Sequence, residues 1–280
     1  MVKYGKYVAL VAVAALAVGT LALVGCSQAA APSAPAPSTS TSTAAPAPVL
    51  KVVTPGTLIA GSDTSFPPFE SMKGNVAEGF DVDLGAAIAK QLGLTLEFKS
   101  YKFDTLIPTL VAGGKFDIIM SGMTINDARK LEIDFSDPYI NSNQSIAVQN
   151  SSTAKAAADL TGKKIGVQSG TTGQAWAKEH IKNAQLVPFD DALAAFSALQ
   201  AGKVDAVVND LPVSAAIVKD TTRGLKIIEE VPTGEQYGIG VSKANPDLLK
   251  AINAALATVK SSGEYDTIYK KWFGVAPTSN

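Results

Sequence analysis

From about residue 50 onward, the chain alternates hydrophobic patterns typical of strands with patterns typical of helices. A short apolar run at 58–60 is followed by large apolar residues at every fourth position between 80 and 92. A helix that buries one face has this spacing. The pattern continues with a strand at 94–98, a helix at 103–111 and a strand at 116–120. This order predicts a parallel sheet with helices on its faces.

The same order then occurs a second time. The end of the helix at 103–111 and the strand after it match residues 199–207, since each has a glycine stop, Lys-x-Asp and an apolar strand. We therefore predict an α/β fold with two lobes of similar build, although helix, glycine and strand follow one another in many α/β chains. The second set comprises strands at 164–167, 185–189 and 204–209 and helices at 172–181 and 192–200.

The first 49 residues have a different character. Lys3 and Lys6 precede an apolar run from 8 to 24, which ends in Gly25 and Cys26. A basic start, an apolar run and small residues before a cut form a secretory signal. Leu-Val-Gly-Cys resembles the lipobox of bacterial lipoproteins, in which the cysteine receives a diacylglycerol and becomes the new amino terminus. We expect a signal peptide at 1–25 and lipid attachment at Cys26; the alternative is an uncleaved anchor helix.

Residues 26–49 predict a tether. Apart from Cys26, they consist almost wholly of Ala, Pro, Ser and Thr, with no charged residue. Such a segment cannot bury enough apolar surface to fold, and its prolines keep it extended. The sequence therefore predicts that a folded part beginning near residue 50 is held at the extracytoplasmic face of a membrane.

Charge and composition exclude several function classes. The net charge of the 280 residues is −1, without a basic stripe for nucleic acid, so a small molecule is the more natural partner. The single histidine, His180, is expected on a helix surface. The sequence shows no His/Cys metal cluster, phosphate-binding loop with lysine or Gly-x-Ser-x-Gly elbow. We expect no cofactor, no metal and no enzyme activity.

Four polar loops follow predicted strands, at 61–69, 121–129, 168–173 and 209–212. Ligands of open α/β sheets bind at the carboxyl ends of the strands, so these loops are expected to face a cleft between the lobes.

The loops offer groups that complement an amino-acid zwitterion. Arg129 can hold a carboxylate at two points, and Asp210 can accept from an ammonium. The helix that opens at 171–173 favours an anion at its N-terminus. Two simpler roles remain open: Arg129 could pair with Asp127 or Glu132, and Asp210 could cap the helix after it.

Six blocks of the sequence stand out, at 63–70, 79–84, 121–124 with Arg129, 134–139, 236–239 and 265–273. In this order they resemble the polar amino-acid-binding proteins of ABC importers, periplasmic binding protein family 3. The resemblance spans 57–274 and implies a two-lobed Venus-flytrap fold with two sheets joined by crossover strands. The chain would cross near 145–149 and 237–241. Lobe 1 would comprise 50–146 and 239–274, and lobe 2 would comprise 147–238, leaving a tail at 275–280.

The resemblance also implies residue roles. Arg129 and the N–H groups of Thr124 and Thr172 would bind the ligand carboxylate. Asp210, the Gly122 carbonyl and the Thr124 hydroxyl would bind the ammonium. Phe66 and Phe103 would sandwich the ligand side chain, although both could be core residues. Asp63 would bind the tip of that side chain. The expected ligand-binding set is Asp63, Phe66, Phe103, Ser121, Gly122, Met123, Thr124, Arg129, Gln168, Thr171, Thr172 and Asp210.

Gln168 bears on the ligand. In glutamine binders of the family a lysine commonly occupies this position, whereas the neutral Gln168 leaves Asp63 without an evident cation. An unpaired buried charge is costly, and a ligand guanidinium or ammonium would pair with it. We expect arginine first, then lysine or ornithine, with glutamine as the main rival. Two different functions stay open beside these: a cyclohexadienyl dehydratase, with Asp63 as proton donor, and a free ligand sensor.

The resemblance implies partners as well. They are an L-amino acid, an ABC permease and, through the permease, a cytoplasmic ATPase. A monomer is expected.

Overall fold

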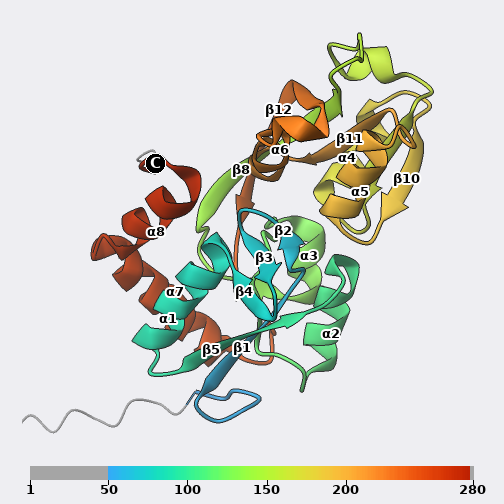
Figure 1. The fold of residues 1–280 in the computed structure, drawn as a ribbon. Coiled ribbons are helices and arrows are strands. Elements are labelled where there is room, and N and C mark those ends of the chain that lie inside the picture. Colours follow the sequence, from blue (N-terminus) through green and yellow to red (C-terminus); the bar gives the residue numbers. More distant parts are fainter. Residues whose placement is uncertain (1–49, 278–280) are drawn as a thin grey trace, which may run out of the picture. The chain divides into compact units, whose positions relative to one another are not determined.

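The computed structural model describes residues 50–277 (Figure 1). The predicted signal peptide at 1–25, the lipid attachment at Cys26 and the linker at 26–49 lie outside the described residues, as does the end of the predicted tail. Between residues 50 and 277, no helix is long and apolar enough to cross a membrane.

The first sheet has five strands in the order β5-β1-β6-β13-β7. β1 is parallel to its neighbours β5 and β6, as predicted, whereas β13 is antiparallel to β6 and β7. The sheet is therefore mixed, with a parallel part built from the first half of the folded chain. Its strands are β1 (Thr57–Ser62), β5 (Thr95–Ser100), β6 (Ile118–Ile119), β7 (Asp134–Phe135) and β13 (Gly240–Val241).

The helix predicted from the fourfold spacing is α1, and Leu84 and Ile88 on it are fully buried. The helix predicted at 103–111 is instead a 3-10 turn followed by α2. Pro108 explains the break, because a helix begun at Phe103 would place it in the interior, where it lacks the N–H and clashes with the preceding turn. The helices of this part are α1 (Phe80–Gln91), η1 (Phe103–Thr105), α2 (Leu106–Ala112), α3 (Asp127–Glu132), α7 (Pro246–Ser261) and α8 (Glu264–Phe273).

A small antiparallel sheet that the sequence did not predict begins within the loop after β1. Its strands β2 (Ser65–Phe66), β3 (Glu70–Lys73) and β4 (Val76–Glu78) follow one another in order. Because β2 carries Phe66, pairing with β3 fixes the aromatic ring at the end of the first sheet.

The second sheet has the order β10-β9-β11-β8-β12. β9 is parallel to β10 and β11, as predicted, and β8 pairs antiparallel with both β11 and β12. Its strands are β8 (Ile140–Gln149), β9 (Lys164–Gln168), β10 (Gln185–Phe189), β11 (Ala206–Asp210) and β12 (Leu225–Tyr237). Its helices are η2 (Ala157–Leu160), α4 (Thr172–His180), α5 (Ala192–Gln200), α6 (Leu211–Val218) and η3 (Thr221–Arg223).

Two long strands, β8 and β12, connect the sheets (Figure 1). The first crossing was expected near 145–149, but β8 already pairs with β11 from Gln144 onward. The chain therefore crosses before Gln144, because β8 continues as one strand from Ile140. The second crossing was expected near 237–241, but Gln236 of β12 already accepts from the Ile125 N–H of the first lobe at 2.8 Å, whereas Val231 still pairs with Gln144. The chain therefore returns to the first lobe between Val231 and Gln236.

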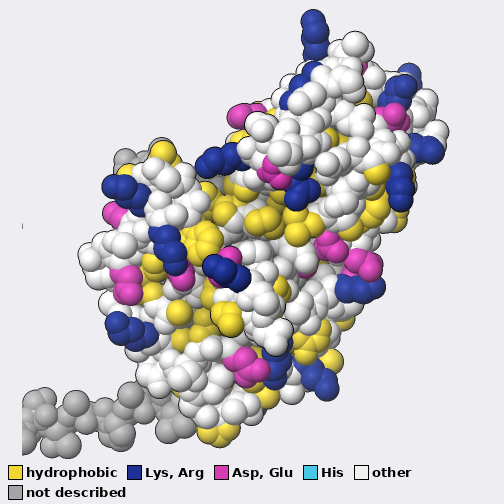
Figure 2. All heavy atoms as spheres, viewed as in Figure 1, with side chains coloured by type: hydrophobic (Ala, Val, Ile, Leu, Met, Phe, Trp, Pro, Cys, Tyr) yellow, Lys and Arg dark blue, Asp and Glu magenta, His cyan; other side chains and the backbone are white. Residues whose placement is uncertain are grey.

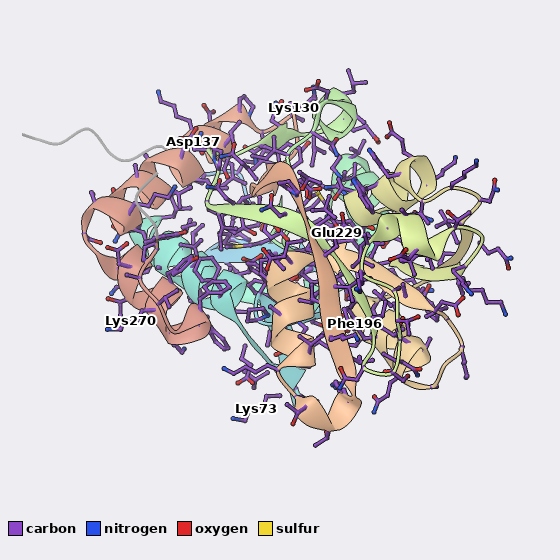
Figure 3. All side chains as sticks on the ribbon, turned by 90° about the horizontal axis from the view of Figure 1, so that it is seen from above. Lys73, Lys130, Asp137, Phe196, Glu229 and Lys270 are labelled. Atoms are coloured by element: carbon purple, nitrogen blue, oxygen red, sulfur yellow. The ribbon has the colours of Figure 1, made fainter. Side chains whose placement is uncertain are left out.

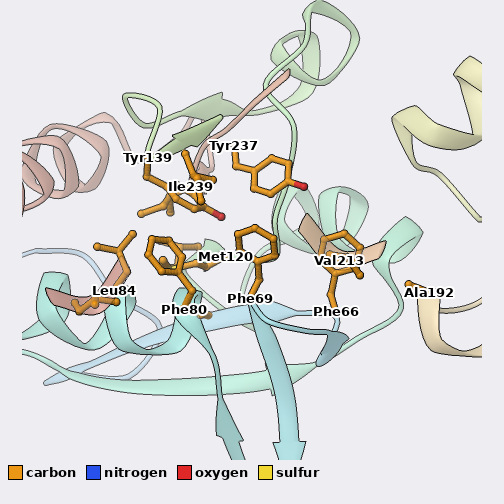
Figure 4. Packing of buried hydrophobic residues seen from close by; sticks show 14 of the residues in the cluster. Phe66, Phe69, Phe80, Leu84, Met120, Tyr139, Ala192, Val213, Tyr237 and Ile239 are labelled. Carbon is orange, nitrogen blue, oxygen red and sulfur yellow. The ribbon is translucent and has the colours of Figure 1, made fainter. Parts of the chain in front are cut away.

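A row of aromatic rings leads from the core of the first lobe toward the second. The ring centroids of Phe80 and Phe69 are 6.1 Å apart, and those of Phe69 and Phe66 are 6.0 Å apart (Figure 4). Tyr237 packs edge-on against Phe69 at 5.2 Å. Edge-to-face and offset arrangements of this kind stabilise cores. Phe66 thus continues the core while its ring reaches the end of the sheet.

The surface carries both signs of charge. Lys73, Lys130 and Lys270 lie at the periphery, while Phe196 of α5 lies in the interior (Figure 3). On the face shown in Figure 2, lysine and arginine are interspersed with aspartate and glutamate. That face therefore offers no single-sign patch of the kind that attracts a polyanion.

Candidate ligand-binding site

A small cavity lies where the loops of both sheets meet. It encloses about 10 Å³, which is close to the room that one water needs, because side chains from both lobes contact each other around it. All its lining residues belong to the set predicted from the sequence. They are Phe66, Phe103, Gly122, Thr124, Arg129, Gln168, Thr171, Thr172 and Asp210.

Arg129 is held at the start of α3. The Asn126 side chain caps this helix by accepting from the Arg129 backbone N–H at 2.9 Å. The buried guanidinium donates to the carbonyls of Thr124 at 2.8 Å and Gly170 at 3.1 Å, and it lies 5.3 Å above the Phe103 ring. Gly170 belongs to the second lobe, so Arg129 contacts both sides of the cavity.

The simpler role of Arg129 in a surface ion pair is not observed. Among residues 50–277 no carboxylate forms an ion pair with it, and Asp127 pairs instead with Lys130 at 4.0 Å. Two bonds to carbonyls engage two of its five N–H donors. Burial lowers the pKa of Arg129, which the nearby charges of Asp210 and Glu235 oppose. A guanidinium stays charged through such a change, so the site keeps one fixed positive group.

Asp210 ends β11 and is buried. It stands at the N-cap of α6 without a side-chain capping bond, so the simpler role of a helix cap is not observed. Its carboxylate accepts from the Gln144 amide at 2.6 Å and from the Tyr237 hydroxyl. Burial, and secondly the charge of Glu235, raise the pKa of Asp210 to about 7.

Glu235 on β12 was not predicted from the sequence. Its carboxylate accepts from the hydroxyls of Thr124 at 2.8 Å and Thr172 at 2.9 Å, and from the Gln144 amide at 3.2 Å. The block at 236–239 directly follows Glu235 in the sequence. The pairing of β12 with β8 is what places Glu235 next to Thr124 and Thr172.

Asp63 and Gln168 face each other across the lobes. The Gln168 amide donates to the Asp63 carboxylate at 2.5 Å, and the Ser65 N–H donates to it at 3.2 Å. Burial raises the pKa of Asp63 to about 6, although the hydrogen bond from Gln168 acts to lower this pKa. Asp63 forms no ion pair with any described residue, and Oε1 of buried Gln168 has no hydrogen-bond partner among them.

The helix N-terminus at 171–173 is formed as predicted. Thr171 caps α4 by accepting from the Gln174 N–H at 3.1 Å, and its hydroxyl donates to the Gln168 carbonyl at 2.8 Å. Thr172 is then the first residue of the helix. Its hydroxyl donates to Glu235, so this first residue links α4 to β12, the strand that leaves the second lobe.

The loop at 121–124 has three different roles. The Ser121 hydroxyl accepts from the Asp63 N–H at 2.9 Å and supports the site without lining the cavity. Gly122 lines it with φ of +51°, and a Cβ there would come within 2.8 Å of the Phe66 ring. Met123 points away, because its side chain is buried in a core cluster with Leu106.

Two fully buried carboxyl groups, for which no role was predicted, support this loop from below. Glu70 accepts from the Ser121 hydroxyl at 2.9 Å. Asp81 accepts from the Gly122 N–H at 3.0 Å and from the Tyr139 hydroxyl at 2.8 Å. Burial raises the pKa of Asp81 to about 6, and burial together with the Asp81 charge raises the pKa of Glu70 well above its usual range. Both carboxyl groups therefore keep a proton to higher pH than they would in water.

The described part of the chain offers no ligand set for a metal ion. No three His, Cys, Asp or Glu residues between 50 and 277 are grouped so that they could hold one. The groups around the cavity are hydrogen-bond donors and acceptors, two aromatic rings and charges of both signs.

The chain is similar to known proteins over nearly the whole described part. The family model of bacterial extracellular solute-binding proteins, family 3, matches residues 58–275. The L-cystine-binding protein TcyJ of Escherichia coli K12 is 34% identical over 232 residues, which are 81% of this chain and 86% of that protein. The ABC transporter arginine-binding protein 1 of the same organism is 36% identical over 219 residues, 76% of this chain and 89% of that protein.

A solved structure has the same fold. An ancestral arginine-binding protein bound to arginine superimposes with a TM-score of 0.75 at 46% sequence identity, covering 78% of this chain and 99% of that one.

Proposed function

Because the chain belongs to family 3 of the bacterial extracellular solute-binding proteins, we propose that it captures a basic L-amino acid, arginine first, between its lobes. The relatives that bind arginine, one of them named as a component of an ABC transporter, support this proposal. The captured amino acid would pass to a membrane permease powered by a cytoplasmic ATPase. The cystine-binding relative shows that the family alone does not determine the ligand, so the choice rests on the site.

The charges around the cavity favour a cation. Asp210 lines the cavity, and the carboxyl groups of Asp63 and Glu235 bond to the lining residues Gln168, Thr124 and Thr172. Among the described residues that line the cavity, Arg129 is the one cationic residue. When the three carboxyl groups are ionised, they exceed the positive charge by two. Arginine and lysine bring two positive groups and one carboxylate, which lessens this excess, whereas zwitterionic glutamine leaves it unchanged. A closed, water-poor site makes such pairing stronger than in bulk water.

The single observation that carries the proposal is the environment of Asp63. Its buried carboxylate is bonded by a neutral amide, and Gln168 next to it presents a buried oxygen without a partner among the described residues. Both groups are acceptors, and a guanidinium supplies five donors in one plane. Phe66 and Phe103, which line the same cavity, offer aromatic faces to a flat cation.

Binding requires the lobes to separate and close again, because the closed arrangement leaves about 10 Å³. Within residues 50–277, the contacts that join the lobes include Asp63 with Gln168, Arg129 with Gly170, and an exposed ion pair of Lys102 and Asp190 at 2.8 Å. A ligand shifts such an equilibrium only through its greater affinity for one form. Micromolar affinity needs about 8 kcal/mol, within reach of one bidentate carboxylate contact, an ammonium site and a side-chain clamp.

Calorimetric titration with L-arginine, L-lysine, L-ornithine and L-glutamine tests the proposal. We expect arginine to bind most tightly and glutamine at least about tenfold more weakly, since a hydrogen bond to a charged group contributes about 1.5–3 kcal/mol. Tight binding of glutamine with no detectable heat for arginine would overturn the choice of ligand. Binding of no amino acid would overturn the function itself.

The cellular location is part of the proposal. The sequence of residues 1–26 supports cleavage before Cys26 and lipid attachment to it, which would hold a monomeric receptor near its permease. Mass spectrometry of the mature N-terminus tests this directly. A diacylglyceryl cysteine is expected, and a chain that still carries residues 1–25 would contradict it; C26S serves as the unlipidated control.

A further inference from the structure

Glu235 stands behind the cavity and does not line it. The cavity wall next to it consists of Thr124 from the first lobe and Thr172 from the second. Both hydroxyls donate to the same oxygen, Oε2 of Glu235, at 2.8 and 2.9 Å. One carboxylate on the strand that connects the lobes thus holds a hydroxyl from each of them.

The direction of these bonds determines what the hydroxyls can offer. A threonine hydroxyl has one hydrogen and two lone pairs, and an ionised carboxylate only accepts. Since each hydroxyl gives its hydrogen to Glu235, it can meet a ligand only as an acceptor. The Gln144 amide nitrogen also lies 3.3 Å from the Thr172 oxygen, but its two hydrogens are closer to Asp210 and Glu235. The Thr124 hydroxyl has no second bond among the described residues.

Gln144 places Asp210 beside this pair of hydroxyls. Its amide donates to Asp210 at 2.6 Å and to Glu235 at 3.2 Å, so it separates the two carboxylates while holding both. Asp210, Thr124 and Thr172 then present oxygens to one cavity. A cluster of acceptors backed by negative charge suits a group that has several donors and a positive charge, such as an ammonium.

We propose that Glu235 is a positioning residue that fixes the hydroxyls of Thr124 and Thr172 as acceptors for the ligand α-ammonium, alongside Asp210. The inference rests on the proposed function, because it requires an amino-acid ligand. It does not depend on which side chain that ligand carries, since every L-amino acid has the α-ammonium. Glu235 therefore contributes to affinity through groups that touch the ligand.

The test compares ligands with and without the α-amino group. Wild type and E235Q are titrated with L-arginine and with 5-guanidinopentanoate, which is arginine without that group. E235Q is expected to weaken arginine about tenfold or more and the deaminated analogue less than about threefold. E230Q is the matched control, since Glu230 lies exposed on the same strand and the variant removes the same charge.

Two results would overturn the inference. Equal weakening of both ligands would make Glu235 a latch between the lobes, and tighter arginine binding by E235Q would make it a competitor of the ligand carboxylate. A double-mutant cycle of E235Q and T124V tests the same role with L-arginine alone. The effect of E235Q is expected to shrink when the hydroxyl is absent, and full additivity would contradict a role through Thr124.

The outcome can be separated from that of the proposed function. If wild type binds glutamine and not arginine, the same cycle is run with L-glutamine and 5-amino-5-oxopentanoate, its deaminated analogue. Thermal unfolding followed by circular dichroism verifies that E235Q and T124V are folded. If E235Q weakens binding of the amino acid more than binding of its deaminated analogue in either pair, the role of Glu235 is supported.

Discussion

The side-chain amide of Gln168 donates a 2.5 Å hydrogen bond to the carboxylate of Asp63 and so joins the end of β9 to the loop after β1. An amide satisfies one oxygen of this carboxylate but leaves its charge in place. Asp63 is 5% exposed, so little solvent is available to stabilise that charge. We therefore expect Asp63 to make the site select its ligand by charge.

Replacing Asp63 with asparagine is expected to discriminate between ligands. D63N removes the charge and keeps the shape, so arginine should bind about 10- to 100-fold more weakly, while glutamine changes less than about threefold. Calorimetric titration of both ligands measures the difference. Equal loss for the two amino acids would mean that Asp63 does not contact the ligand side chain.

The companion variant Q168K acts from the opposite lobe. A lysine at this position would form an ion pair with Asp63 and neutralise its charge. Arginine binding is therefore expected to weaken as it does in D63N. Glutamine binding should be retained or strengthened. Unchanged arginine affinity in Q168K would contradict the assignment of the Asp63 charge to the ligand.

The sequence predicted the parts of the site that depend on local pattern. Gln168 and Asp210 are the last residues of β9 and β11, and Asp63 directly follows β1. An apolar run followed by polar residues is visible without a structure. Phe66 and Phe103 required the family resemblance, since aromatic residues of a core have the same local pattern.

The parts that the sequence missed depend on distant pairing. Glu235 reaches Thr124, which is 111 residues away, only because β12 pairs antiparallel with β8. Glu70 lies on a small strand inside a segment that reads as a loop. A buried carboxyl group has the same local sequence signal as an exposed one, so its burial becomes apparent only when the tertiary contacts are known.

Arg129 is expected to be required for every amino-acid ligand. R129K keeps a positive charge but loses the planar fork that holds a carboxylate at two points, and it leaves the carbonyls of Thr124 and Gly170 with fewer donors. We expect at least about 100-fold weaker binding of arginine, because breaking a buried charged pair costs about 2–5 kcal/mol. Titration of R129K measures this loss.

A matched variant for Arg129 is R223K. Arg223 pairs with Asp220 at 3.5 Å near the end of η3, outside the cavity lining. The same change of side chain there is expected to leave the affinity for arginine within about twofold, since surface pairs contribute little. Retained tight binding in R129K would contradict the carboxylate role of Arg129.

Binding of a cationic ligand is expected to weaken in acid. The pKa of Asp210 is raised to about 7 and that of Asp63 to about 6, so both groups take up protons as the pH falls from 8 to 5. A protonated carboxyl group must lose its proton to pair with a cation. The affinity for arginine should therefore fall below pH 7 by up to about tenfold per pH unit for each proton released.

Proton release provides an independent measurement of this effect. Titration at pH 6.5 in buffers of different ionisation enthalpy should reveal protons leaving the complex. D63N should release fewer, because the proton of that carboxyl group is no longer present. An affinity that is flat between pH 5 and 8 would contradict the participation of both carboxylates.

The free energy of unfolding of the ligand-free protein is expected to change with pH in the opposite direction, because Asp81 stabilises the folded state in acid. Its pKa in the folded protein is raised from 3.8 to about 6 by burial, so the folded state binds more protons than the unfolded state between these values. The contribution of Asp81 to the free energy of unfolding is therefore complete below about pH 4 and is lost as the pH rises through 6. Its size is about 1.4 kcal/mol for each unit by which the pKa is raised.

D81N isolates this contribution. Its amide oxygen can still accept from the Gly122 N–H and the Tyr139 hydroxyl, while its NH₂ group can donate to Glu70. The free energy of unfolding, measured by denaturant titration at several pH values, should decrease less between pH 4 and 6 in D81N than in wild type. D127N, at an exposed aspartate, should keep the wild-type pH dependence. A D81N curve parallel to that of wild type would show that Asp81 is ionised throughout, and the Gly122 loop would then rest on a fixed charge.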